Sequence, residues 1–336
     1  MTSSNAKVSV MTQPYTLYGG ELSYFTRKLE AAMIFYDADF SIQSKSPDNA
    51  AEIEQRSGTH QVPVLLTPEN WMVADTTPLL MMLDGRFPDR RMFPPGKLGV
   101  LTHIVEEYFD EWIARTMVHY RWHYPASAEF ASLRMARGNA EAAARVRAWG
   151  PRACRATGTD SEHQQQQAEA EYVRILEALE QQLMETPYAL GSRPTAVDCI
   201  VLGGLRAHTH MDPDPKRVTS RYPRVVTWCE EAADTWDGNG ELSRFEEPTS
   251  FARFVLEEMV GTYQPYVLGN KAAREAGAKA FHVKTYGEEV SYLSRPYPER
   301  SRQMVVDRIA LTLPEDERLE VKVWLQETGL SASFGS

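Results

Sequence analysis

Residues 62–66 read "VPVLL", and residues 67–83 continue as "TPENWMVADTTPLLMML". The first run is typical of a buried β-strand, but Pro63 has no N–H to donate to a sheet ladder. One interpretation is an edge strand, or a strand that begins at the proline. The other is a cis Val62–Pro63 bond, which turns the N–H and C=O of Val62 out of the sheet, where an extended peptide can pair with them as an added strand. The run alone favours neither.

The residues on both sides of this run predict a small mixed sheet. "YTLYG" (15–19) and "FSIQS" (40–44) are typical of strands, and apolar residues recur at helical spacing between them. A short helix, the strand "WMVAD" (71–75) and a helix from Thr76 follow. A helical crossover joins parallel strands and a short turn joins antiparallel ones. We therefore predict a βαβ-ββα domain of about four strands over residues 1–92.

The next part of the chain predicts an all-helical domain. Four breakers crowd "RFPDRRMFPPG" (86–96), which places a domain boundary there, and helical periodicity over 97–250 predicts a bundle. Within the bundle, residues 152–163 and the glutamine tract that follows are interpreted as a loose polar linker. Thr195 and Asp198 have the spacing of a capping box, which begins an almost wholly apolar helix.

Residues 251–336 form a predicted C-terminal extension. Its periodicity predicts helices around a hairpin at "FHVKTYGEEVSYL" (281–293). The pattern favours extra packing on the helical domain or a surface for a partner over a separate active site.

Composition excludes several classes of function. The formal net charge is -10, and a protein that binds nucleic acid needs clustered Lys and Arg, so we expect no nucleic-acid partner. No stretch reaches the roughly 18 apolar residues of a membrane span, and the first 15 residues lack the order of a signal peptide. Cys154, Cys199 and Cys229 have no CxxC spacing, which suits reduced thiols. We expect a cytoplasmic protein without a membrane partner.

The segment "ADTTPLL" (74–80) places an acid and a hydroxyl where a strand gives way to a helix. Free N–H groups and the helix dipole make a helix start a carboxylate site, and Asp75 can take an ammonium group. Asp75 and Thr76 together fit a zwitterionic γ-glutamyl group. The alternative is that either residue is simply an N-cap.

These motifs, in this order and spacing, resemble those of the cytosolic glutathione transferases over roughly residues 13–250. The resemblance implies an α/β plus all-α fold, with a thioredoxin-like domain followed by a helical bundle. It implies glutathione as co-substrate, no metal and a homodimer. It also implies that a cis-proline binds the cysteinyl backbone and that the acid–hydroxyl pair holds the γ-glutamyl end. The implied glutathione-binding residues are Lys45, Gln61, Val62, Pro63, Asp75 and Thr76.

The resemblance also implies a catalytic hydroxyl. "SYFTRK" offers Ser23 at the start of the first helix, with Tyr24 where the serine-type classes have proline. The Ser23 hydroxyl and the helix N-terminus can stabilise the thiolate of bound glutathione. Tyr18 at the end of the first strand is the rival donor, and Tyr24 is a weaker third. The structural alternative for Ser23 is a helix cap.

The second substrate is expected against the first helices of the helical domain, where aromatic side chains suggest an apolar or aromatic electrophile. We predict Trp112, Tyr120 and His123 as its contacts, although such aromatics are equally typical of a core. His119 and His123 have metal-ligand spacing, but no acid accompanies them, so we predict no metal.

The predicted function is a glutathione transferase that activates the thiol for attack on a small-molecule electrophile. A glutathione-dependent isomerase or lyase uses the same thiolate, and the residues do not distinguish it. The alternative from another class is a binding or assembly protein that keeps the fold without the chemistry. The tyrosine after Ser23, the Asp75–Thr76 pair in place of the commoner Glu-Ser, and the extension all favour that alternative.

Overall fold

A four-stranded mixed sheet with strand order β2-β1-β3-β4 forms the N-terminal domain. In the computed structural model, which describes residues 14–335, β1 pairs parallel with β2 and antiparallel with β3, and β3 pairs antiparallel with β4. This confirms the predicted βαβ-ββα arrangement. Residues 1–13, on which the signal-peptide prediction rests, lie outside the described part. The elements are β1 Tyr15–Gly19, α1 Tyr24–Phe35, β2 Phe40–Ser44, α2 Pro47–Ser57, β3 Val64–Leu66, β4 Met72–Ala74, α3 Thr76–Arg86 and η1 Pro88–Arg90.

Pro63 immediately precedes an interior strand of the sheet. The Val62–Pro63 peptide bond is cis, and β3 begins at the next residue, Val64. Because β3 lies between β1 and β4, the edge-strand interpretation is wrong. Leu17 of β1 pairs with Leu65 of β3, and both side chains are fully buried, so the centre of the sheet faces the core.

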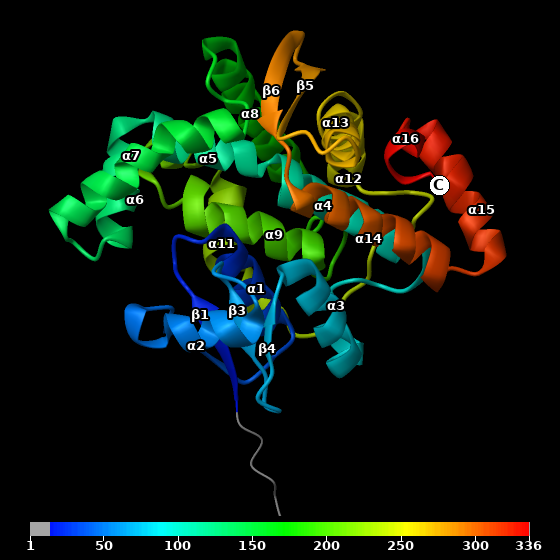
Figure 1. Cartoon of the computed structure of the whole chain (residues 1–336). Coiled ribbons are helices and arrows are strands. Elements are labelled where there is room, and N and C mark those ends of the chain that lie inside the picture. Colours follow the sequence, from blue (N-terminus) through cyan, green and yellow to red (C-terminus); the bar gives the residue numbers. More distant parts are fainter. Residues whose placement is uncertain (1–13, 336) are drawn as a thin grey trace, which may run out of the picture.

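Helices that pack against α1 of the N-terminal domain form the second part of the molecule (Figure 1). Residues 152–163 were predicted as a linker, which is wrong, because α7 and α8 occupy most of them. The helices are α4 Gly96–Glu107, η2 Tyr108–Trp112, α5 Ala114–His123, α6 Pro125–Met135, α7 Ala140–Ala156, α8 Glu162–Glu185, α9 Ala196–Gly204, η3 Leu205–Thr209, α10 Pro213–Thr219 and α11 Pro223–Thr235. Both η2 and η3 have π-helical hydrogen bonding.

Helix α9 lies between the two parts, and its start is the predicted capping box. The backbone N–H of Thr195 donates to Asp198 Oδ2 at 2.7 Å, and the Thr195 hydroxyl accepts from the backbone at position 198. All nine residues of α9 are buried. At Gly203 a Cβ would stand 2.8 Å from the carbonyl oxygen of Tyr24, so only glycine lets α9 and α1 approach this closely.

The C-terminal extension packs on the helical domain and continues its core. The predicted hairpin is confirmed as β5 and β6, while α14 lies along α4 with its first turn near the N-terminal domain (Figure 1). The elements are α12 Ser250–Gly261, α13 Tyr263–Glu275, β5 Ala280–Thr285, β6 Glu288–Leu293, α14 Pro296–Thr312, α15 Glu315–Glu327 and α16 Ser331–Phe334.

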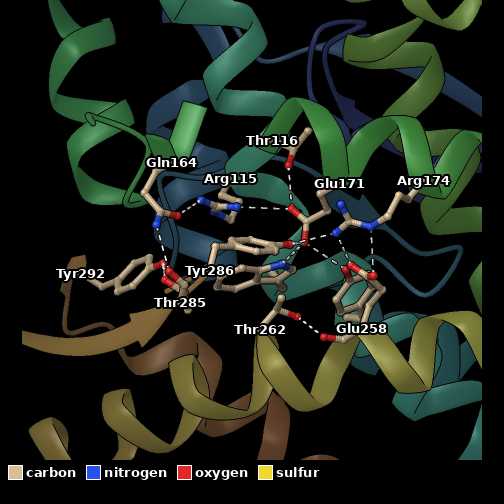
Figure 2. Close-up of polar contacts among 12 residues, drawn as sticks. Arg115, Thr116, Gln164, Glu171, Arg174, Glu258, Thr262, Thr285, Tyr286 and Tyr292 are labelled. Carbon is tan, nitrogen blue, oxygen red and sulfur yellow. Dashed lines mark hydrogen bonds and ion pairs between the residues drawn. The ribbon is translucent and has the colours of Figure 1, made fainter. Parts of the chain in front are cut away.

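Buried polar contacts hold the hairpin to the bundle, as Figure 2 shows. The Tyr286 hydroxyl, at the hairpin turn, donates to Glu171 Oε1 of α8 at 2.7 Å. Gln164, from the tract interpreted as a linker, accepts from Arg115 at 2.9 Å and donates to the carbonyl of Thr285 at 3.0 Å. A polar run was taken for a solvated segment because the buried partners of Gln164 lie 49 and 121 residues away in the chain.

Across residues 14–335, no helix combines the length and the apolar character needed to cross a bilayer.

Candidate functional site

A cavity of about 510 Å³ opens between the N-terminal domain, the π-helix η2 and the start of α14. Five of the six residues predicted to bind glutathione line it, namely Gln61, Val62, Pro63, Asp75 and Thr76. Lys45, the sixth, is not part of the lining. Its Nζ donates to the carbonyl of His60 at 2.6 Å and pairs with Glu54 at 2.7 Å.

The main chain at Val62 offers hydrogen-bonding groups to this cavity. Pairing of β3 with its neighbours starts at Val64, and within residues 14–335 Val62 takes part in no backbone hydrogen bond. Pro63 is buried, whereas Val62 is half-buried and lines the cavity. An extended peptide lying against Val62 would find an N–H and a C=O free to pair with it.

The start of α3 forms the neighbouring wall. Asp75 is the N-cap residue, with a φ of 76°, but its carboxylate makes no capping hydrogen bond. The side chain ion-pairs instead with Arg300 of α14. The first N–H groups of a helix have no partner inside the helix. The backbone N–H groups of Thr76 and Thr77 are therefore available as hydrogen-bond donors at the positive end of the α3 dipole. The N-cap alternative therefore holds for the position of Asp75 but not for its carboxylate.

The three candidate hydroxyls differ in position. Ser23 is the N-cap of α1, and its Oγ accepts from the Thr26 N–H at 3.3 Å. It lies two residues before Phe25, which lines the cavity, but is not itself part of the lining. Tyr24 is buried, and its hydroxyl donates to the carbonyl of Phe109 at 2.9 Å. Tyr18 is half-buried in β1, opposite Val64, and also lies outside the lining.

The predicted second-substrate residues are not brought to this cavity. Trp112 is 1% exposed and donates its indole N–H to Glu171 at 2.6 Å. Tyr120 is buried against Tyr172, and His123 is exposed on α5 with its ring stacked on His119. For Trp112 and Tyr120, the core placement that the sequence left open is the observed one.

Sequence reasoning missed five charged or phenolic residues of the lining. Asp110 and Glu111 come from η2, and Arg295, Tyr297 and Arg300 come from the extension. The acids carried a signal, because "EEYFDEW" places four carboxyls within six residues of a helix that is otherwise apolar. The extension residues carried none, since their relation to Pro63 depends on how α14 packs against α4.

Electrostatics within the lining are uneven. Burial, followed by the charge of Asp110, raises the pKa of Glu111 to about 8, so this carboxyl is mostly protonated at pH 7. Asp110 is compensated by Lys28 of α1, whose Nζ lies 2.7 Å from its Oδ1. Burial alone would lower the pKa of Lys28, but Asp110 and Glu106 outweigh it and raise that pKa. Lys28 is therefore charged.

A metal centre was not expected here. In the part of the chain that the structure describes, no group of three or more His, Cys, Asp or Glu side chains is arranged to hold a metal ion. His119 Nε2 lies 2.8 Å from Glu169 Oε1, and its pKa is lowered, chiefly by burial.

One family model matches part of the chain. Residues 161–231 match the family model described as the glutathione S-transferase C-terminal domain. This confirms the predicted family resemblance. The matched segment covers α8, α9, η3 and α10 and most of α11, which include the capping box and the helix that packs on α1. No curated protein matches the chain.

Several solved structures resemble the chain at low identity, among them glutathione S-transferases. One from Rhodospirillum rubrum F11 has 14% identity and a TM-score of 0.46, covering 71% of this chain and 98% of that one. One from Methylobacterium radiotolerans JCM 2831, in complex with glutathione sulfonate, has 20% identity and a TM-score of 0.43, with coverage of 67% and 92%. The β-etherase LigF from Sphingobium sp. strain SYK-6 has 13% identity and a TM-score of 0.48, with coverage of 67% and 97%. These structures are too distant to assign chemistry to this chain.

Proposed function

We propose that this protein is a glutathione-dependent transferase that binds glutathione in the cavity at Pro63 and activates its thiol for attack on an electrophile. One observation supports this most: the unpaired main chain of Val62 and the Asp75–Thr76 pair at the start of α3 line the same cavity. The Val62 main chain suits the cysteinyl backbone of glutathione. The Asp75–Thr76 pair suits the γ-glutamyl end, where an ammonium and a carboxylate share one carbon. The small-molecule electrophile, the homodimer and the cytoplasmic location stay predictions.

The proposed chemistry requires a thiolate. A free thiol has a pKa near 8.5, so only a few per cent is ionised at pH 7. Lowering the pKa by ~2 units, worth ~2.7 kcal/mol, would make most of the bound thiol nucleophilic. The free N–H groups of α1 and α3 and the Ser23 hydroxyl are the groups of this chain that we propose for that task.

Calorimetric titration with glutathione tests the proposal. We expect saturable heat with the wild-type protein and at least about tenfold weaker binding by Asp75→Asn, because a charged hydrogen-bond acceptor is lost. Asp89→Asn is the matched control, since Asp89 is exposed on η1, away from the cavity. No heat with the wild-type protein would refute the proposal.

A binding protein without catalysis is the second candidate. It is favoured by one observation: none of Ser23, Tyr18 and Tyr24 lines the cavity. The absorbance of bound glutathione as a function of pH separates the two. A thiol pKa lowered by binding supports the enzyme, and an unchanged pKa supports the binding protein. A product screen then distinguishes conjugation from isomerisation and ether cleavage.

A further inference from the structure

The cations of the cavity come from the C-terminal extension. Among the described residues of the lining, the carboxyl groups are Asp75, Asp110 and Glu111, and the guanidinium groups are Arg295 and Arg300. Both arginines belong to the start of α14, where Arg295 is the N-cap and Arg300 is the fifth helical residue. Without the extension, the lining would present Asp75, the Lys28-paired Asp110 and the mostly protonated Glu111, with no cation to face the two carboxylates of the ligand. Such a lining offers no attraction to those carboxylates, which is unfavourable for binding.

The arginine segment is held in place by contacts away from the cavity. Asn270 of α13 donates to the carbonyl of Arg295 at 2.9 Å and accepts from its N–H at 2.9 Å. The Ser301 hydroxyl donates to the buried carboxyl of Glu107, which also accepts from Tyr263 at 2.8 Å. These contacts fix the backbone on both sides of Tyr297, so the arginines reach the cavity from an ordered turn.

Arg300 lies where the amino-acid end of a γ-glutamyl ligand would bind. Its guanidinium pairs with Asp75 and stands 4.8 Å from the centre of the Tyr297 ring. Asp75 can bind the ammonium of such a ligand, and Arg300 is then beside the carboxylate on the same carbon. The Arg300–Asp75 ion pair does not close the site to a ligand, because the Arg300 side chain is 56% exposed. Breaking an ion pair that exposed to admit a ligand would reduce the ligand's affinity by less than about fivefold.

Arg295 lines the same cavity as Asp110 and Glu111 of η2, and its guanidinium has a hydrogen-bond donor without a partner. Its Nη2 donates to the Tyr266 hydroxyl at 2.7 Å, whereas its Nε has no hydrogen-bond partner. Within residues 14–335 no carboxylate lies within ion-pair distance of it. The charged group that acts on Arg295 is Glu111, which lies beyond ion-pair distance and whose own pKa is raised to about 8, chiefly by burial. Because Glu111 is mostly protonated at pH 7, an anionic group from a ligand would supply the missing charge.

We propose that the extension is part of the ligand site, with Arg300 binding the γ-glutamyl carboxylate of the peptide and Arg295 binding an anionic group on the second substrate. This inference rests on the proposed function, because the ligand is the same peptide. It makes the preferred electrophile an anionic one, such as an aromatic carboxylate, and not the plain apolar compound that the aromatics of α5 suggested.

Three ligands and three variants test the inference by calorimetry on the full chain. The ligands are glutathione, S-benzylglutathione and S-(4-carboxybenzyl)glutathione, which place no group, a neutral ring and a carboxylated ring where the electrophile would lie. The variants are Arg300→Gln, Arg295→Gln and the matched control Arg274→Gln, since Arg274 is exposed on α13 outside the cavity.

We expect Arg300→Gln to weaken glutathione binding about tenfold and the control to leave it unchanged. The wild-type protein should prefer the carboxybenzyl ligand over the benzyl ligand by about tenfold, and Arg295→Gln should abolish that preference. Glutathione binding by Arg300→Gln that equals or exceeds wild type, or a wild-type protein without the preference, overturns the inference. A wild-type protein that binds none of the ligands overturns the proposed function with it.

Discussion

The Nζ of Lys28 lies 2.7 Å from Oδ1 of Asp110, which joins α1 of the N-terminal domain to the π-helix η2 of the helical domain. Lys28 also pairs with Glu106 and donates to the Thr77 hydroxyl at 2.9 Å, and its side chain is fully buried. One ammonium therefore connects α1, α3, α4 and η2 directly behind the cavity. Since Asp110 lines that cavity, its position depends on Lys28.

Replacing Lys28 by methionine tests this connection. Removing one partner of a buried ion pair leaves the other uncompensated, so Lys28→Met should lower the free energy of unfolding by about 3–5 kcal/mol in urea denaturation. Arg27→Met is the control, because the Arg27–Glu30 pair is partly exposed and should contribute less than about 1 kcal/mol. If both variants lowered the free energy of unfolding equally, the buried Lys28 pairs would contribute no more to stability than the partly exposed Arg27–Glu30 pair. Adding Glu106→Gln to Lys28→Met should restore part of the loss.

Glu171 should stabilise the docking of the extension. This buried carboxylate accepts from Tyr286 at 2.7 Å and from Thr116 at 3.2 Å, and it pairs with the buried Arg115 at 3.4 Å (Figure 2). Glu171→Ala should cost about 3–5 kcal/mol, because Arg115 loses its only charged partner among the described residues.

The control for Glu171 lies on the same helix. Glu177 is exposed on α8, so Glu177→Ala should change stability by no more than about 0.5 kcal/mol. Hydrogen exchange should show faster opening of β5 and β6 in Glu171→Ala. Unchanged protection there would mean that the hairpin docks independently of Glu171.

Two substitutions at Ser23 separate capping from catalysis. Ser23→Ala should cost about 1 kcal/mol of stability and Ser23→Gly only a few tenths, because glycine is a better N-cap than alanine. If the hydroxyl also stabilises the thiolate, both variants should raise the pKa of bound glutathione and reduce kcat/KM equally. Turnover that follows the order of stability would assign Ser23 to the helix cap alone.

The charge of Glu111 should make ligand binding depend on pH. Its raised pKa of about 8, due first to burial and then to Asp110, means that the carboxyl is neutral below that pH and adds a negative charge to the cavity above it. Lys28 and Arg295 oppose this shift. The affinity for S-benzylglutathione, which has no free thiol, should therefore fall as the pH rises through about 8, by roughly fivefold.

Two variants check the pH dependence of binding. Glu111→Gln cannot ionise and should bind S-benzylglutathione with a flat profile between about pH 6.5 and 8.5. Glu177→Gln, remote on α8, should keep the wild-type profile. A wild-type affinity that stays constant or rises over this range would contradict the assignment.

Local chemistry made much of the fold and part of the site predictable. Strand alternation, helical periodicity and the Thr195–Asp198 spacing depend on residues within one turn or one strand, and the structure has the corresponding elements. The positions of Pro63, Asp75 and Thr76 were also predictable from local sequence. Each stands where a strand begins or gives way to a helix, and the sheet brings those ends together.

Only the tertiary structure decided which partners these residues meet. The glutamine at 164 has the same local signature as a solvated one, yet it is buried between Arg115 and Thr285. Arg300 lies 225 residues from Asp75, and nothing near it in the chain indicates that α14 would bring the two together. Backbone hydrogen bonding and apolar periodicity are local and visible in sequence. The charge of the cavity depends on packing between distant segments, which no local pattern encodes.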